Sequence, residues 1–216
     1  MAKSITNSVK WIFWMCLLAC GAAETIAQTD SLYTVLARNP SDSVRVQCYQ
    51  ELSRYYLNHR GYDSAVIIAR RGIDLSEKAG FGPNTELHRL LINAHDAKME
   101  YRESRDLIPP LIEKLESSND QKDKAWLSVF EGSYYYRSGE FTKSIEAFEK
   151  ARLLAGDLEM QDAVAQAYLG LARVYYGLGD YELESIHYKR YLELVDMKRE
   201  KYAVYFVLTR LGDIQR

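Results

Sequence analysis

Between Trp126 and Tyr191, apolar and polar positions alternate with the period of an α-helix, and one helix–turn–helix pattern occurs twice. The first copy contains Gly132, Tyr135, Gly139, Glu140, Phe141, Ser144 and Phe148, and the second contains Ala172, Tyr175, Gly179, Asp180, Tyr181 and Tyr188. Corresponding residues are 40 positions apart, as Gly132 and Ala172 illustrate. A constant period of this length predicts a stacked array of helical repeats, because each unit buries its apolar face only against its neighbours.

Weaker copies of the pattern precede these two. Four units align on the aromatic residue at the turn, in steps of 39, 40 and 40, at Tyr62, Tyr101, Phe141 and Tyr181. We therefore expect an all-α fold. Each turn aromatic is expected to fill the wedge between neighbouring units and to bury on the order of 150–250 Å².

The pattern resembles the tetratricopeptide repeat (TPR) family, which has a small residue and an aromatic in the first helix and Gly-acidic-aromatic at the turn. Over about residues 44–216 the resemblance implies a right-handed α-solenoid of antiparallel helix pairs, here with a period of about 40 residues. Small residues at Ser53, Gly132 and Ala172 would let the two helices of a unit approach closely. The longer period implies longer helices, or longer loops such as the one at Gly156-Asp157.

Two units depart from the pattern. The second has Ile92 at the small position and Pro109-Pro110 in its second helix, where proline removes a backbone hydrogen bond. We expect a kink or break near Ile108. The fourth has Glu184 and Tyr191 where the family usually has small residues, so its helices are expected to pack less closely or to be shifted.

Residues 1–27 are predicted to be a signal peptide. Lys3 and Lys10 precede an uncharged apolar or small stretch over residues 11–23, which is too short to span a bilayer as a helix. Two processing alternatives remain open. Cleavage after Ala27 fits an ordinary signal peptidase, whereas residues 17–20 resemble a lipobox, in which residues 1–19 are removed and Cys20 is lipidated. A buried N-terminal helix of the domain is the structural alternative.

Residues 28–43 are predicted to form a short helix over residues 32–37, with Asp30 or Ser31 at its start, and a turn in which Ser41 caps the next helix. The array would then occupy residues 44–216, as four units and the first helix of a fifth. That fifth helix is inferred because Leu208, Leu211 and Gly212 repeat Tyr168, Leu171 and Ala172. Two interpretations stay open, a terminal capping helix and the front part of a longer protein, and we favour the second.

The sequence gives little indication of a catalytic, cofactor or metal site. The net charge of −2 and the pI near 6.1 argue against nucleic acid as a partner. No motif indicates a cofactor, a metal or a catalytic group, so we expect no enzyme activity in this region. His88 and His95 would lie about 10.5 Å apart on one helix, too far to share a metal. Cys48 is expected to be a small core residue.

The resemblance implies a protein or peptide partner in a concave groove lined by the first helices. The candidate groove residues are Arg54, Arg89, Asn93, Trp126, Tyr136, Arg137, Arg173 and Tyr176. The last five, from Trp126 to Tyr176, are expected to form one contiguous patch. Aromatic and arginine side chains of this kind dominate binding energies when they lie in an interface.

The arrangement is similar to the exported N-terminal TPR region of bacterial sensor kinases and regulators. It implies an exported interaction or sensory module, the N-terminal part of a membrane-bound signalling protein. The alternative is a free-standing periplasmic or lipid-anchored scaffold in envelope assembly. We expect contact with a membrane only through a lipid on Cys20 or through a span beyond Arg216.

Overall fold

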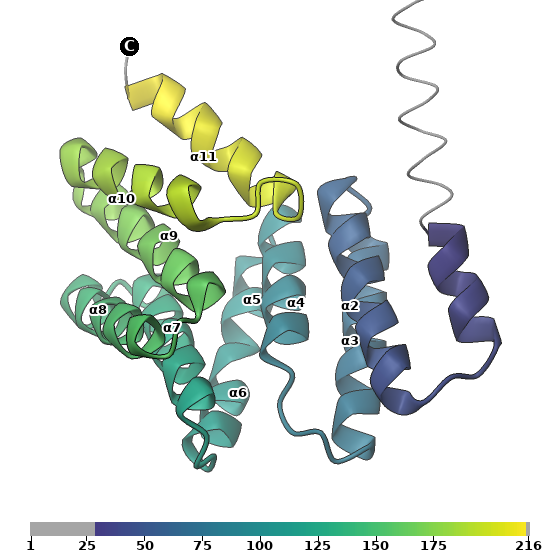
Figure 1. Ribbon diagram of the computed structural model, residues 1–216. Helices are drawn as coiled ribbons and strands as arrows, with labels where there is room; N and C mark the ends of the chain where they lie inside the picture. The colour runs from purple at the N-terminus through teal and green to yellow at the C-terminus, as the bar shows by residue number, and fades with distance from the viewer. Residues whose placement is uncertain (1–28, 215–216) are drawn as a thin grey trace, which may run out of the picture.

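The helices follow one another as antiparallel pairs (Figure 1). The computed structural model describes residues 29–214, which contain helices and no strand. In chain order the named helices are α2 (Asp42–Asn58), α3 (Tyr62–Lys78), α4 (Thr85–Ala97), α5 (Tyr101–Asp106), α6 (Ile108–Glu116), α7 (Gln121–Arg137), α8 (Phe141–Asp157), α9 (Gln161–Leu178), α10 (Tyr181–Leu194) and α11 (Lys201–Ile214). Residues 29–37 form a further helix. The predicted all-α architecture is confirmed.

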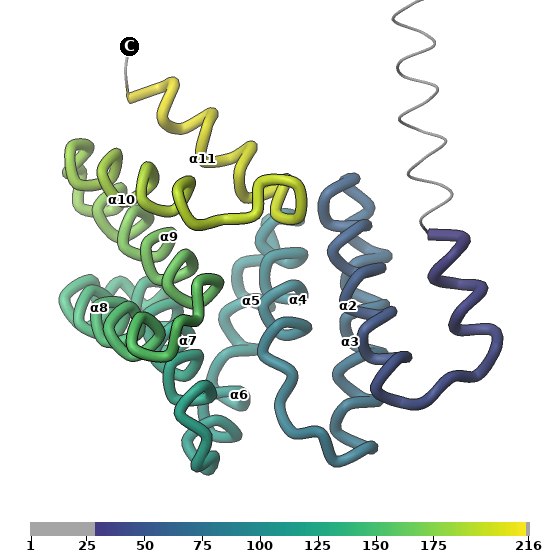
Figure 2. The backbone as a smooth tube through the Cα atoms, in the orientation of Figure 1, coloured from purple at the N-terminus to yellow at the C-terminus, as the bar shows by residue number. Residues whose placement is uncertain are grey.

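Neighbouring helices pack as a repeat array requires. Helix α2 packs on α3, α7 on α8 and α9 on α10, while α3 also contacts α4 and α8 contacts α9. The first helices of neighbouring units pack on each other as well, α2 on α4 and α7 on α9. The backbone trace in Figure 2 shows these successive hairpins stacked into a curved array. The longer period comes from longer helices, since α8 continues through Gly156-Asp157, where a loop was predicted.

Small residues let the two helices of a unit approach each other closely at the positions that the pattern predicts. A Cβ atom at Gly132 would lie 2.8 Å from the ring of Phe148. Ser144 donates a hydrogen bond from Oγ to the Gly132 carbonyl at 2.7 Å. In the first unit the donor lies on the other helix, because Ser53 Oγ donates to the Ala65 carbonyl at 3.1 Å. Both bonds tie the two helices of a unit at corresponding places.

The turn aromatics do not all fill the wedge between units. Tyr101 is 62% exposed and Tyr181 is 53% exposed, so the predicted burial is wrong for both. Each of the four aromatics is the first residue of its second helix, and this places it at the end of the pair. The ring that fills the interior is Phe148, two turns later in α8, which is 2% exposed.

The second unit is interrupted as predicted. Helix α5 ends at Asp106 and α6 begins at Ile108, with Pro109 and Pro110 in the first turn of α6, where a missing N–H costs no helical bond. In addition, α4 does not pack on α7 as α2 packs on α4. The array therefore has an N-terminal half (α2–α6) and a C-terminal half (α7–α11), which are joined mainly through α6 and α7 (Figure 1).

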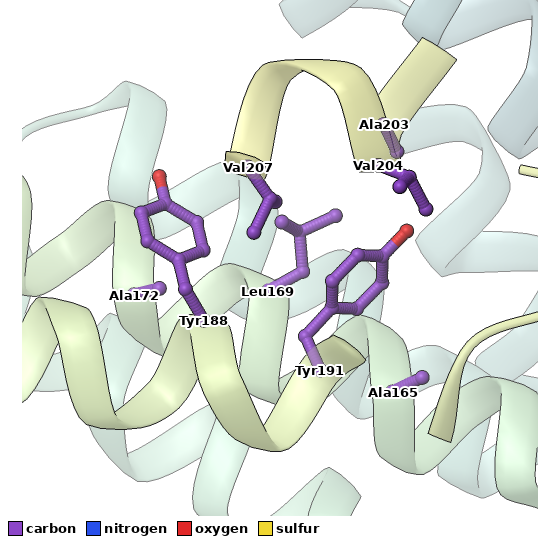
Figure 3. Close-up of a cluster of buried hydrophobic side chains, with 8 residues drawn as sticks. All are labelled: Ala165, Leu169, Ala172, Tyr188, Tyr191, Ala203, Val204 and Val207. Atoms are coloured by element: carbon purple, nitrogen blue, oxygen red, sulfur yellow. The ribbon is translucent and has the colours of Figure 1, made fainter. Parts of the chain in front are cut away.

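The fourth unit accommodates its large residues by packing them against α11. Tyr188 and Tyr191 are buried in a cluster with residues of α9 and α11. In Figure 3 their rings flank Leu169 and Val207. The predicted shift between α9 and α10 stays a prediction, because the two helices pack on each other.

The N-terminal predictions need correction. The first described helix already includes residues 29–31, so Asp30 and Ser31 lie inside it and do not cap it. Ser41 occupies the N-cap position of α2, but its side chain makes no capping hydrogen bond. The predicted signal peptide and Cys20 lie outside the described residues. Among residues 29–214, no helix combines the length and apolar character that crossing a bilayer requires.

Candidate functional site

A pocket of about 920 Å³ lies between the two halves of the array. The N-terminal half contributes Asp96, Tyr101, Arg102 and Arg105. The C-terminal half contributes Tyr136, Arg137, Phe141, Arg173, Tyr176, Gly177, Tyr188, Tyr202, Ala203 and Phe206. Helices α4, α5, α7, α8, α9, α10 and α11 therefore all reach this site.

The pocket lining contains four arginines, at positions 102, 105, 137 and 173, and one carboxylate, Asp96. Arg102 and Arg105 are paired with Asp106 outside the lining. Arg137 donates from Nη2 to Asp96 Oδ2 at 2.5 Å and from Nη1 to the Ser133 carbonyl at 3.2 Å. Burial lowers the pKa of Arg137, and the positive charge of Arg173 adds to that effect, although Asp96 opposes it. Two guanidinium groups therefore share this pocket at an electrostatic cost.

Arg173 is the cation without a counterion in this pocket. The described part of the chain offers its guanidinium no ion pair and no hydrogen bond, although the side chain is half-buried. Its positive charge acts on the hydroxyls of Tyr188 and Tyr202, lowering pKa values that burial raises. An arginine held among tyrosine rings without a carboxylate is poised to bind an anion.

Aromatic side chains form the rim of the pocket. Tyr176 is 51% exposed, and the guanidinium of Arg210 lies 4.4 Å from its ring centroid. Arg210 is held there by Glu184, which accepts hydrogen bonds from its Nε at 2.7 Å and its Nη2 at 3.1 Å. Glu184 itself is fully buried. Glu184, which departs from the repeat pattern, thus positions one edge of the rim through its hydrogen bonds to Arg210.

The structure brings together four of the predicted patch residues, Tyr136, Arg137, Arg173 and Tyr176. The placement of Trp126 in that patch is wrong. Its ring packs between units, with a centroid 6.1 Å from that of Phe130, because it lies three turns before the pocket on α7. Asn93 is half-buried and lies outside the pocket lining.

Arg54 and Arg89 are also outside the pocket, in a buried ion-pair cluster with Glu86 and Glu200. Arg89 donates from Nη1 and Nη2 to the two carboxylate oxygens of Glu200 at 3.0 and 2.8 Å. It also donates from Nε to Glu86 Oε2 at 2.9 Å. Arg54 donates to Glu86 from Nη2. The prediction that these two arginines face a partner is therefore wrong, because their donors are used within the chain.

The cluster holds its carboxylates ionised. Burial would raise the pKa of Glu86, but the guanidinium groups of Arg89 and Arg54 outweigh it and set that pKa at about 2. For Glu200, burial is likewise outweighed, chiefly by Arg89, and the pKa is lowered. Two arginines and two glutamates thus form a neutral group.

Several pocket residues were not predicted. Tyr101, Arg102 and Arg105 lie on the second helix of unit two, which the groove prediction left out. They lie on α5, the short helix that ends before the break at Leu107. Tyr202, Ala203 and Phe206 come from α11, which the repeat register identified as a fifth first helix without assigning it to the groove.

The other candidate residues have structural roles. Nδ1 of His88 lies 2.8 Å from the Asn84 carbonyl, and Nδ1 of His95 lies 2.7 Å from Glu100 Oε2. Within residues 29–214 no group of histidine, cysteine and acidic side chains is arranged to hold a metal ion. Cys48 is buried, which raises the pKa of its thiol and disfavours the reactive thiolate.

Parts of this chain are similar to known proteins. The chain is 26% identical over 124 residues to response regulator aspartate phosphatase E of Bacillus subtilis (strain 168), a match covering 54% of this chain and 33% of the relative. It thus spans about a third of that protein. Among solved structures, a signal transduction ATPase with numerous domains from Pyrococcus horikoshii, which has a tetratricopeptide repeat sensor, matches with a TM-score of 0.41 and 16% identity. That match covers 81% of this chain and 26% of the other.

The family comparison agrees with the repeat geometry. Residues 123–196 match the tetratricopeptide repeat family. The matched region includes most of α7 and all of α8, α9 and α10, which are the two units with the clearest sequence repeat. Since these helices also pack in successive antiparallel pairs, residues 123–196 form tetratricopeptide repeats.

Proposed function

We propose that this chain is an exported interaction and sensory module that binds a short acidic segment of a partner protein in the pocket between its halves. The observation that carries the proposal is Arg173, a half-buried guanidinium without a counterion. Tetratricopeptide repeats bind protein partners, so a peptide is the natural source of the missing negative charge. Binding, not catalysis, is the proposed activity.

The shape and chemistry of the pocket support a short segment. A volume of about 920 Å³ is within the range of ligand pockets and accommodates a few side chains. A carboxylate can accept two parallel hydrogen bonds from one guanidinium, which fixes its orientation. Tyr136, Tyr176 and Phe206 supply rigid apolar area around that contact.

A role in signalling is supported by two observations. The relative from Bacillus subtilis is named for its action on response regulators. The N-terminal sequence has the charge and apolar pattern of an export signal. We therefore propose that the chain is the N-terminal, extracytoplasmic part of a membrane-bound signalling protein, whose remaining part carries the signal onward.

A second candidate is a periplasmic or lipid-anchored scaffold in envelope assembly, which the Leu17-Leu18-Ala19-Cys20 sequence favours. If Cys20 is lipidated, the Cys20→Ser protein should lose its membrane fraction and its incorporated palmitate when expressed in a bacterium. Fractionation and palmitate labelling measure both. A mature N-terminus found at Gln28 by sequencing would exclude lipidation.

A peptide-display selection tests the pocket directly, because it needs no known partner. A library of random twelve-residue peptides selected on the full chain should be enriched in aspartate and glutamate. Arg173→Ala should weaken the selected peptides at least about tenfold, since hot-spot truncations cost 2 kcal/mol or more. Affinity should also fall with salt because the contact is ionic. Fluorescence polarisation of labelled peptides gives the constants.

The matched control is Arg190→Ala, which removes an exposed arginine that is paired with Glu193 and is not part of the pocket lining. It should leave peptide affinity unchanged. Peptides enriched without acidic residues would contradict the proposed charge preference. Peptides that bind Arg173→Ala and Tyr176→Ala as tightly as the unchanged chain would contradict the assignment of this pocket as the site.

A further inference from the structure

The first unit and the last helix of the array are in contact, although they are far apart in sequence. Arg89 of α4 binds Glu200, 111 residues later. Arg199 donates from Nη2 to Glu51 of α2 at 2.8 Å, 148 residues earlier. In Figure 1 the connection between α10 and α11 lies beside the ends of α2 and α4.

A side chain of α2 also holds the start of α11. Asn58 accepts a hydrogen bond from the backbone N–H of Tyr202 at 3.0 Å and donates one to the Arg199 carbonyl at 2.9 Å. The first N–H groups of a helix have no partner within it, so Asn58 supplies from the opposite end of the array what a capping residue normally supplies locally. We call these bonds, with the Arg54–Glu86–Arg89–Glu200 cluster, the end-to-end contact.

The pocket lies between this contact and the weak joint of the array. On one side, the two halves are joined through α6 and α7, next to the break at Leu107. On the other side, the end-to-end contact joins α2 and α4 to α11. Across the pocket itself, the structure shows one ion pair between the halves, Arg137 with Asp96.

From this arrangement we infer that the array is a hinged clamp, in which the end-to-end contact holds the two halves closed over the pocket and its release opens the pocket about the α5–α6 joint. Rotation about a few residues at element ends is how hinged proteins open. Helix α11 supplies Tyr202, Ala203 and Phe206 to the pocket wall, so moving its first turn changes the site directly.

The contact has an ionic part, centred on Glu200, and an apolar part, in which the Tyr202 ring packs against a cluster that contains Leu57 and Leu90. Substitution of Glu200 separates the ionic part from the apolar one. Glu200 pairs with Arg54 and Arg89. It is the carboxylate that the connection between α10 and α11 contributes to the cluster. Replacing Glu200 by a cation would put three positive charges together, opposed by Glu86 and by the more exposed Glu51, which pairs with Arg54. Apolar packing of α11 on α9 and α10 does not involve this side chain, so the C-terminal half keeps its core.

A distance measurement without any ligand tests the clamp. Spin labels are placed at Glu103→Cys in α5 and Glu182→Cys in α10, both exposed, in a full chain whose three native cysteines are replaced. Double electron–electron resonance should give one short distance between the two labels when Glu200 is unchanged. Glu200→Arg should add a population at longer distances, and Glu200→Gln should add a smaller one.

The control is Glu193→Arg, the same charge change at an exposed position of α10, which should leave the distances unaltered. Circular dichroism checks that each variant keeps its helices. If Glu200→Arg loses its helices, the label distances measured in Glu200→Gln decide the test. Unaltered distances in a folded Glu200 variant would overturn the inference. Because no peptide is present, this result stands apart from whether the pocket binds an acidic segment.

Discussion

Replacing Phe148 by alanine is expected to lower the free energy of unfolding by about 3–5 kcal/mol, the range for large-to-small changes of buried aromatics. The ring is held by close contact on two sides. A Cβ atom at Gly132 would approach it to 2.8 Å, and one at Gly170 would approach it to 2.2 Å. The array has no side chain at either glycine that could move into the vacated volume, so the cavity should persist.

Urea denaturation followed by circular dichroism measures this loss. The control is Leu153→Ala on the same helix, where the side chain is 59% exposed, and a change within about 0.5 kcal/mol is expected there. Equal effects of the two substitutions would show that Phe148 is not the ring that joins units three and four.

Replacing Arg89 by alanine is expected to cost a similar amount, about 3–5 kcal/mol, for a different reason. The guanidinium is buried and bonded to both Glu86 and Glu200. Its removal leaves two carboxylates in the cluster with Arg54 as the remaining cation. The matched control is Arg45→Ala, which breaks the more exposed pair with Asp42 and should cost no more than about 1 kcal/mol.

The pH dependence of stability should identify the same cluster. Glu86 has a folded pKa of about 2, below the value of about 4.3 for an unperturbed glutamate. A lowered folded pKa contributes stability that is present above pH 4.3 and is lost as the pH falls toward 2. The stability difference between the unchanged chain and Glu86→Gln should therefore shrink over that interval. A constant difference from neutral pH down to pH 2 would contradict this role of the cluster.

The repeat period predicted the structural features that depend on residues close together in the sequence. Position within the period indicated which residues are small and buried, as at Gly132 and Ser53, and the paired prolines indicated the break before α6. These features depend on contacts within one unit, where sequence spacing fixes geometry. The period also predicted that Tyr136, Arg137, Arg173 and Tyr176 share one face, since first helices of successive units lie side by side.

What the period could not predict is how far the array curves. The rotation from unit to unit accumulates, and the break at Leu107 changes it at one step. Arg54 and Arg89 were assigned to a concave groove because the family resemblance implies that first-helix side chains line it. In the structure the curve brings Glu200 to them, and the same closure brings α11 into the pocket wall. Trp126 shows a related limit, because a position near the start of α7 faces the interior between units.

The contact of Asn58 with Tyr202 changes how such an array loses its structure. In an open array the terminal units have one neighbour each, so they detach first and unfolding proceeds inward. Here the first unit also touches the start of α11, so among the described helices α2 and α11 cannot detach without breaking bonds to each other. Closing a chain segment of this length is entropically costly, so these bonds are expected to form late in folding. During synthesis, Arg54 and Arg89 are made long before Glu200, and until it arrives Glu51 and Glu86 of the N-terminal half are their partners.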